Sequence, residues 1–262
     1  MGRNDEAGDA APIASVERAL EVLDAFEAGP GALTLAELSE RTGLYKSTIL
    51  RIAETLAMRG YLVREADGTY QIGPKPFLLG ARYQSSVIPA EWVLPVLRQL
   101  VADTGESASF NVRNGEHRVC LLRVDSPHLI RDHTQPGDIR PLGRGAAGKL
   151  MLAFERPDDP KFDPIRREGI ARSDGEIEAG MAGIGAPVIG SDGRLRGVLT
   201  VSGPSSRFTR SAVARFEATL VDAARRLTER IGGPVVRSDA RKRRSLRAGI
   251  DPARHAPRNL PS

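Results

Sequence analysis

The sequence predicts an α+β protein with a small helical N-terminal domain and a larger, mixed α/β second domain. Three observations support this fold class. Apolar residues recur at three- and four-residue spacing through residues 13–59. The period then changes to two on either side of Asp67-Gly68, which is a strong hairpin signal. From residue 89 onward, strand-like and helical segments alternate, and a long helical pattern over 208–231 ends the second domain.

Changes of pattern and composition divide the chain into five parts. We expect a disordered N-terminus over 1–12, a winged helix-turn-helix domain over 13–74, a linker helix over 75–88, a second domain over 89–233 and a basic disordered tail over 234–262.

Composition excludes several classes of protein. The chain has 262 residues, of which 40% are hydrophobic and 27% charged, as in ordinary globular proteins. No apolar run approaches the roughly 20 residues of a membrane span, and the polar N-terminus lacks the apolar core of a secretory signal. A single cysteine, Cys120, excludes an intrachain disulfide and a thiolate zinc cage. We therefore expect a cytoplasmic protein without membrane contact.

Charge is distributed unevenly along the chain. Residues 233–262 carry a net +6, which is more than the overall charge of +5, so the rest of the chain is close to neutral. Residues 1–44 carry −6 and residues 45–82 carry +3. This change of sign inside a small domain is expected if one of its faces meets a polyanion.

The N-terminal elements follow from local signals. A first helix from Ile13 stops at Gly29-Pro30-Gly31, and Thr34-Leu35-Ala36-Glu37 forms a capping box for a second helix. Gly43 fits the left-handed residue that closes this helix, and a third helix follows over 45–59. The order of helix, helix, tight turn, helix and hairpin is that of a winged helix-turn-helix.

Polar groups gather where such a domain contacts DNA. We predict DNA contacts from the start of the second helix, the first turns of the third and the hairpin: Thr34, Tyr45, Lys46, Ser47, Thr48, Arg51 and Arg64. Hydroxyls suit phosphates, and Lys and Arg suit phosphates or guanine. The plainer interpretation is a three-helix bundle with an incidental hairpin, but the wing and the change of charge favour DNA binding.

In the second half, we predict the following elements: a connecting helix over 77–86, a helix over 91–102, strands over 107–113 and 118–124, a Gly-rich loop over 141–148, a short helix over 149–154, strands over 184–189 and 195–202, and the final helix over 208–231. Residues 156–165 contain three prolines and have little helical promise.

The segment Gly143–Lys149 matches the phosphate-binding pattern G-x-x-x-x-G-K. A nucleotide-binding switch or enzyme is therefore an alternative function. Against it, Leu150 replaces the Ser or Thr that would bind magnesium, and the preceding segment makes a poor buried strand. A weaker interpretation remains, in which backbone N–H groups at this helix start hold a small anion.

No catalytic or metal-binding set is evident. The four histidines are scattered in sequence, at His117, His128, His133 and His255, and no zinc-binding helix motif or nucleophile elbow occurs. Cys120 and His117 would point to opposite faces of a strand, so Cys120 is better interpreted as a small core residue. We expect no cofactor and no enzyme activity.

Several segments, in this order and spacing, resemble the IclR family of bacterial transcription regulators over residues 13–232. They are Ser15–Leu20, Leu35–Leu38, Thr42–Thr48, Tyr70–Pro74, Gly148-Lys149, Ala186–Val188 and Val201–Pro204. The resemblance implies a winged helix-turn-helix joined by a linker helix to a GAF-like effector-binding domain. It also implies a homodimer or dimer of dimers that binds a small organic acid or aromatic effector and regulates a catabolic operon.

The resemblance also implies where an effector would bind. The backbone N–H groups of Ala146 and Ala147 would face an acid, Thr200 and Ser202 would supply hydroxyls, and Met181 would form an apolar wall. Gly183 stands where the family often has Cys, and Ser173-Asp174 is offset from a common acidic position. No cationic side chain is assigned to the anion. The short segment between Lys149 and Gly169 predicts a pocket with less helical cover than in the family.

The sequence therefore predicts a ligand-responsive, DNA-binding transcriptional regulator, expected to be a repressor, on a palindromic operator. Besides the nucleotide switch on Gly143–Lys149, one further alternative remains. It is a GAF-like sensory protein whose helix-turn-helix serves only for dimerisation.

Overall fold

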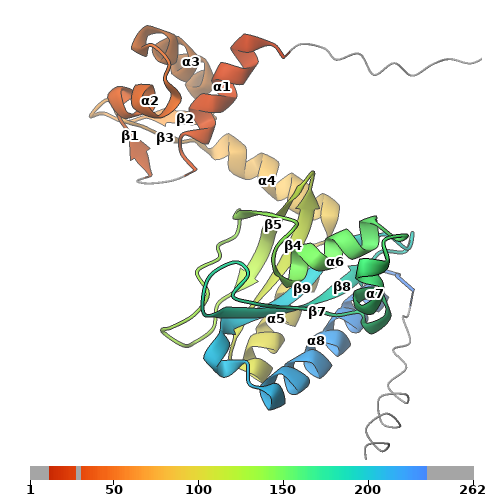
Figure 1. Ribbon diagram of the computed structural model, residues 1–262. Helices are drawn as coiled ribbons and strands as arrows, with labels where there is room; N and C mark the ends of the chain where they lie inside the picture. The colour runs from red at the N-terminus through yellow and green to blue at the C-terminus, as the bar shows by residue number, and fades with distance from the viewer. Residues whose placement is uncertain (1–11, 28–30, 235–262) are drawn as a thin grey trace, which may run out of the picture. The chain divides into compact units, whose positions relative to one another are not determined.

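The computed structural model describes residues 12–27 and 31–234, which form two compact units divided between Ser86 and Val87 (Figure 1). Three expectations fall on other residues and so lie outside the described part of the chain. They are the disordered N-terminus, the stop at Gly29-Pro30 and the basic tail beyond residue 234.

The first unit contains helices α1 (Ala14–Asp24), α2 (Leu35–Thr42), α3 (Lys46–Met58) and α4 (Pro74–Val87), and strands β1 (Ala32–Leu33), β2 (Leu62–Arg64) and β3 (Tyr70–Ile72). The three strands pair antiparallel in the order β1-β3-β2. One apolar core holds the unit together, and its buried members are Val22, Leu33, Leu38, Ile49, Ala53, Leu62 and Tyr70. The predicted winged helix-turn-helix is confirmed, with a third short strand added to the wing.

The second unit is built on a six-stranded antiparallel sheet with the order β6-β5-β4-β9-β8-β7. Its strands are β4 (Ser107–Asn114), β5 (His117–Val124), β6 (Ile139–Pro141), β7 (Ala171–Asp174), β8 (Met181–Ile189) and β9 (Leu195–Pro204). Helices α5 (Ala90–Thr104) and α8 (Arg210–Arg230) cover one face of the sheet, and α6 (Gly145–Glu155) lies on the other (Figure 1). A 3-10 turn over Pro160–Phe162 leads into the short helix α7 (Asp163–Glu168).

Alternate side chains of β9 point to opposite faces of the sheet, one covered by α5 and α8 and the other by α6. Leu199 and Val201 join the core under α5 and α8, whereas Val198 packs on the α6 side. Thr200 and Ser202 share the face of Val198, because side chains two apart on a strand point the same way. Polar residues of the central strand are therefore placed beneath α6.

Two expectations about the region after residue 140 are wrong. The helix predicted from Lys149 begins four residues earlier, at Gly145. Residues 160–168 are largely helical although they contain Pro160 and Pro164, because both prolines lie in the first turn of a helix, where no intrahelical N–H bond is needed.

The glycines of the Gly143–Lys149 motif have a packing role. A Cβ at Gly148 would lie 2.2 Å from the backbone oxygen of Leu142, and Gly145 has a φ of +77°. The chain therefore needs glycine at both positions to turn from β6 into α6 and to pack the helix on its own preceding loop. Close backbone approach at Gly148 and the positive φ of Gly145 account for these two glycines without a nucleotide.

Candidate DNA-reading helix and ligand cavity

Helix α3 presents a polar face at its start. Tyr45 precedes the helix with 85% of its surface exposed, and Lys46, Ser47 and Arg51 are also exposed. Within the described residues, the side chains of Lys46 and Arg51 have no ion-pair partner. The opposite face holds Ile49 and Ala53, which are fully buried. The helix is therefore fixed by its apolar side while its cations remain free for an external partner.

The turn before α3 is held rigidly. The backbone N–H of Glu37 donates to Thr34 Oγ1 at 3.2 Å, and the N–H of Thr34 donates to Glu37 Oε2 at 2.8 Å, which completes the predicted capping box. Gly43 closes α2 in the left-handed conformation, with φ of +70°. The Ser39 hydroxyl then donates to the Leu44 carbonyl at 2.7 Å. Thr34, predicted as a DNA contact, thus already uses its hydroxyl to position α2.

The wing carries the remaining predicted contact. Arg64, at the end of β2, is exposed, and its guanidinium lies 5.8 Å from the ring centre of Tyr70. Asp67 stabilises the hairpin turn by accepting from the N–H and the hydroxyl of Thr69. Thr48 is half-buried between the exposed and the buried faces of α3. Five of the seven predicted DNA contacts are therefore exposed and have no capping role. They are Tyr45, Lys46, Ser47, Arg51 and Arg64.

The second unit contains a cavity of about 70 Å³ between α6 and the sheet. Its lining residues are Ser109, Arg118, Asp132, Thr134, Gly145, Ala146, Ala147, Ser173, Ile177, Glu178, Met181, Ala182, Gly183, Thr200 and Ser202. It thus gathers seven of the eight residues that the resemblance indicated. The eighth, Asp174, does not line the cavity, and its carboxylate accepts a hydrogen bond from the Ser205 hydroxyl.

The two predicted hydroxyls are already engaged in buried networks. Thr200 Oγ1 lies 2.6 Å from the Ser109 hydroxyl, and Asn111 Nδ2 donates to both. The Ser202 hydroxyl donates to the carboxylate of Asp132. These groups therefore line the cavity and hold its wall together at the same time.

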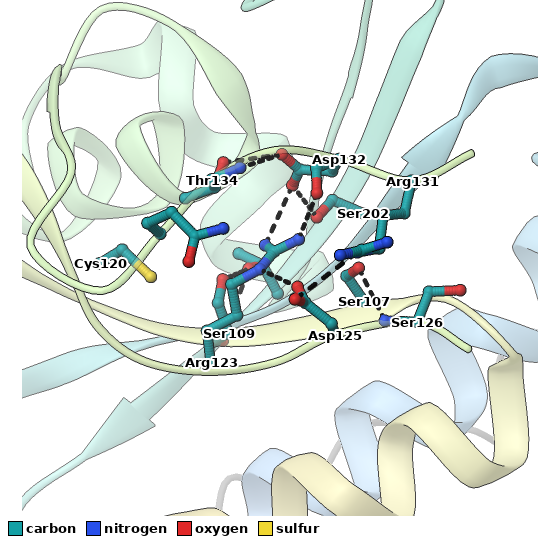
Figure 2. A network of polar contacts seen from close by, with 12 residues as sticks. Ser107, Ser109, Cys120, Arg123, Asp125, Ser126, Arg131, Asp132, Thr134 and Ser202 are labelled. Carbon is teal, nitrogen blue, oxygen red and sulfur yellow. Dashed lines mark hydrogen bonds and ion pairs between the residues drawn. The ribbon is translucent and has the colours of Figure 1, made fainter. Parts of the chain in front are cut away.

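A second network shares Asp132 with this wall and extends from it to Arg123 (Figure 2). The side chain of Arg123 is only 2% exposed, and its guanidinium lies between Asp125, at 2.7 Å, and Asp132, at 3.2 Å. Asp132 also accepts from the N–H and the hydroxyl of Thr134. Burial raises the pKa of Asp132, but hydrogen bonds from Ser202 and Thr134 and the charge of Arg123 outweigh burial, so the pKa of this carboxyl is lowered overall.

Sequence reasoning missed a cation in the cavity wall. Arg118, on β5, is 8% exposed and lines the cavity, and its Nη1 donates to Asn111 Oδ1 at 2.9 Å. Its Nε is buried and has no hydrogen-bond partner among the residues that the structure describes. The sequence contains one indication of this position. Arg118 lies two positions before Cys120 in the predicted strand over 118–124, so the two side chains share a face, and Cys120 is interpreted as a core residue.

Cys120, also on this strand, is fully buried, and burial raises the pKa of its thiol to about 11. The thiol is therefore protonated at neutral pH, as expected of a small core residue rather than of a nucleophile. No group of three or more His, Cys, Asp or Glu side chains in residues 12–27 and 31–234 is arranged to hold a metal ion.

The start of α6 is partly occupied by a carboxylate of the chain itself. Glu176 accepts from the N–H of Gly145 at 3.1 Å, and its other oxygen pairs with Lys149. Lys149 also donates to the carbonyl of Arg172 at 2.9 Å. A phosphate-binding loop connects a strand to a helix and keeps its Lys for phosphate. Here the preceding strand is the short edge strand β6 and Lys149 is committed internally, so the geometry does not favour the nucleotide alternative.

None of the helices in the described part of the chain is long and apolar enough to cross a membrane.

Comparisons with known proteins agree for both units. Residues 15–66 match the family described as the IclR helix-turn-helix domain, and residues 85–161 and 160–229 match that described as the C-terminal domain of the bacterial transcriptional regulator IclR. The regulator BhcR of Paracoccus denitrificans is 31% identical over 93% of this chain and 94% of its own length. The transcriptional repressor IclR of Escherichia coli is 26% identical over 84% and 91%.

The fold is shared with solved structures. An IclR transcriptional regulator from Alicyclobacillus acidocaldarius superposes with a TM-score of 0.71 at 23% identity, covering 85% of this chain and all of the other.

Proposed function

The chain belongs to the IclR family of bacterial transcriptional regulators, and from this premise we propose that it represses an operon of small-molecule metabolism until a small acid binds in the α6 cavity. The observation that carries the proposal is the face of α3. Lys46 and Arg51 are exposed, and no described residue pairs with them, on a helix whose other side is fixed in the core. Free donors on a rigid helix are what reading a major groove requires.

We propose that the chain binds DNA as a homodimer on a palindromic operator. Two helices of the first unit leave apolar side chains uncovered: Val16 and Leu20 on α1 are 51% and 52% exposed, and Phe77 and Leu78 on α4 are 76% and 55% exposed. Exposed large apolar side chains on these helices favour association. A second copy on a two-fold axis would present a second α3 to the next half-site. A dimer of dimers would engage two such operators. The bacterial cytoplasm, where operator DNA lies, is the expected location.

Footprinting of the full chain on the DNA upstream of its own gene and its neighbours tests the proposal. We expect protection of two half-sites about one helical turn apart, or a multiple of that spacing. Deletion of the gene should raise transcription of the protected operon, whereas a fall would indicate activation instead. Absence of any specific footprint would favour the sensory alternative, in which the helix-turn-helix only dimerises.

A further inference from the structure

Within the described residues, no carboxylate lies at ion-pair distance from Arg118, and Asp132 and Asp138 attract its charge only from farther away. The one hydrogen bond of the Arg118 side chain there is to the neutral amide of Asn111. Burial lowers the pKa of Arg118, yet a guanidinium stays protonated in proteins. A buried charge without a partner is strongly unfavourable. Arg123, buried on the same strand, has two carboxylates beside it.

The unpaired guanidinium lies beside the start of α6. A Cβ built on Gly145 would be 3.5 Å from Arg118 Nη2. Glu176 accepts from the N–H of Gly145, but no residue in the described chain accepts from the N–H groups of Ala146 and Ala147. First-turn N–H groups and the helix dipole favour an anion. The Arg118 guanidinium and the N–H groups of Ala146 and Ala147 are therefore two independent sets of donors at the same end of the cavity, the start of α6.

The cavity also limits the size and charge of its occupant. A cavity of about 70 Å³ is several times the roughly 10–15 Å³ that one buried water needs, so it accommodates a small organic molecule. Asp132 already accepts from Arg123, Ser202 and Thr134. Glu178 is exposed, lines the cavity and has no ion-pair partner among the described residues. A second carboxylate on the ligand would meet this negative charge.

We infer that Arg118 is the specificity-determining residue for the effector, and that the effector is a small monocarboxylic acid. Its carboxylate accepts from the Arg118 guanidinium and from the N–H groups of Ala146 and Ala147. Met181 and Ile177 contact its carbon atoms. This inference rests on the proposed function, because it names the ligand class of the same cavity.

The test is a ligand-dependent thermal shift of the full chain, with propionate, glycolate and lactate as probes. Sodium chloride at equal concentration controls for ionic strength, and propionamide controls for shape without charge. We expect at least one acid to raise the melting temperature of the wild type, and propionamide to have no effect. A larger shift with benzoate or succinate than with all three acids would overturn the limits on size and charge. Absence of a shift with all three would overturn the inference.

Arg118→Met keeps the volume of the side chain and removes its charge. We expect it to weaken acid binding at least about tenfold, since hydrogen bonds to charged groups are the strong ones. Arg140→Met is the matched control. Arg140 faces Arg118 across the β5–β6 pair and, among the described residues, also has a buried Nε without a hydrogen-bond partner, but it pairs with Asp138 at 3.7 Å and does not line the cavity. Equal weakening by both variants, or by neither, would overturn the inference.

If Arg118→Met does not fold, Arg118→Lys replaces it. Lysine keeps the charge but lacks the forked donors, so binding should weaken and still exceed that of propionamide; unchanged binding would overturn the role of Arg118. The thermal readout involves no DNA. If the unliganded wild type does not bind the operator, the proposed regulator is refuted and the ligand inference is unaffected. If Arg118→Met responds to the acid as the wild type does, the ligand inference is refuted and the proposed regulator is unaffected.

Discussion

Arg118 and Arg123 lie on the same strand and are both buried, but their charges are balanced differently. Arg123 is neutralised inside the chain by Asp125 and Asp132, so it stabilises the fold whether or not a ligand is present. In the described part of the chain, the one hydrogen-bond partner of Arg118 is an amide. A buried cation without a paired anion destabilises the ligand-free protein. An anionic ligand that pairs with this cation removes the destabilisation, and this gain in free energy adds to its affinity.

The Arg123–Asp132 pair predicts a pH-dependent stability. The pKa of Asp132 is lowered in the folded state from an ordinary value of 3.8. Its carboxylate therefore stabilises the fold fully above that value, and the contribution is lost as the pH falls through the lowered pKa. Asp132→Asn should reduce the free energy of unfolding by about 3 kcal/mol at pH 7, because it removes one partner of a buried pair.

Urea unfolding at pH 7 and at successively lower pH checks this prediction. The difference between wild type and Asp132→Asn should begin to shrink below about pH 4 and should be lost as the pH falls through the lowered pKa of Asp132, where this side chain becomes as uncharged as Asn. Asp125→Asn is the control, since the side chain of Asp125 is 38% exposed and should contribute less. A constant difference across the pH range would show that Asp132 acts through shape alone.

Lys46 and Arg51 predict the effect of substitution on DNA affinity. Arg51→Ala should weaken operator binding by roughly 1–3 kcal/mol if this side chain reads a base, and Lys46→Ala should weaken binding to all sequences alike, as a phosphate contact does. Gel-shift titration on the native promoter measures both. Arg226→Ala, which removes an equal charge from α8, should leave affinity unchanged. Wild-type affinity in the Lys46/Arg51 double variant would show that α3 is not the reader.

At the scale of the element, the capping box of α2 determines how α3 is presented. Thr34→Ala removes the side-chain acceptor of the Glu37 N–H and should destabilise the first unit by about 1 kcal/mol. Thr55→Ala is the matched control, because Thr55 lies exposed inside α3 and bonds only to the Arg51 carbonyl. Thermal unfolding should separate the two variants, and an equal loss in both would contradict a specific capping role.

Elements with strong local signals were predictable from the sequence. The capping box, Gly43 and the Asp67-Gly68 and Asn114-Gly115 turns each carry their own conformational reason. Strands β1, β6 and β7 were not predicted, because each has only two to four residues and exists through its pairing with a longer strand. The period-two pattern of β9 placed Thr200 and Ser202 on one face, whereas Asp132 and Thr134 come from a loop that has no period to read.

At the scale of the whole molecule, charge is concentrated in a C-terminal segment of which all but the first residue lies beyond the described residues. The segment 234–262 carries eight basic and two acidic residues. Its deletion should lower the slope of log affinity against log salt on random-sequence DNA, because fewer phosphates are neutralised. Titrations between 50 and 200 mM salt measure the slope, and circular dichroism verifies the remaining fold. Equal slopes for the full and shortened chains would contradict this prediction.

The order of strands in the second unit has a consequence for how the protein is made. The central pair β4–β9 joins residues such as Ser109 and Thr200, which lie 91 positions apart. On the ribosome, at about 5–20 residues per second, the β4–β5 hairpin waits roughly 5–20 seconds for its neighbour. During that interval its apolar edge is open to other chains. The first unit, whose contacts are local, completes its core earlier. Nascent chains of this protein are therefore expected to depend on chaperones through their second unit.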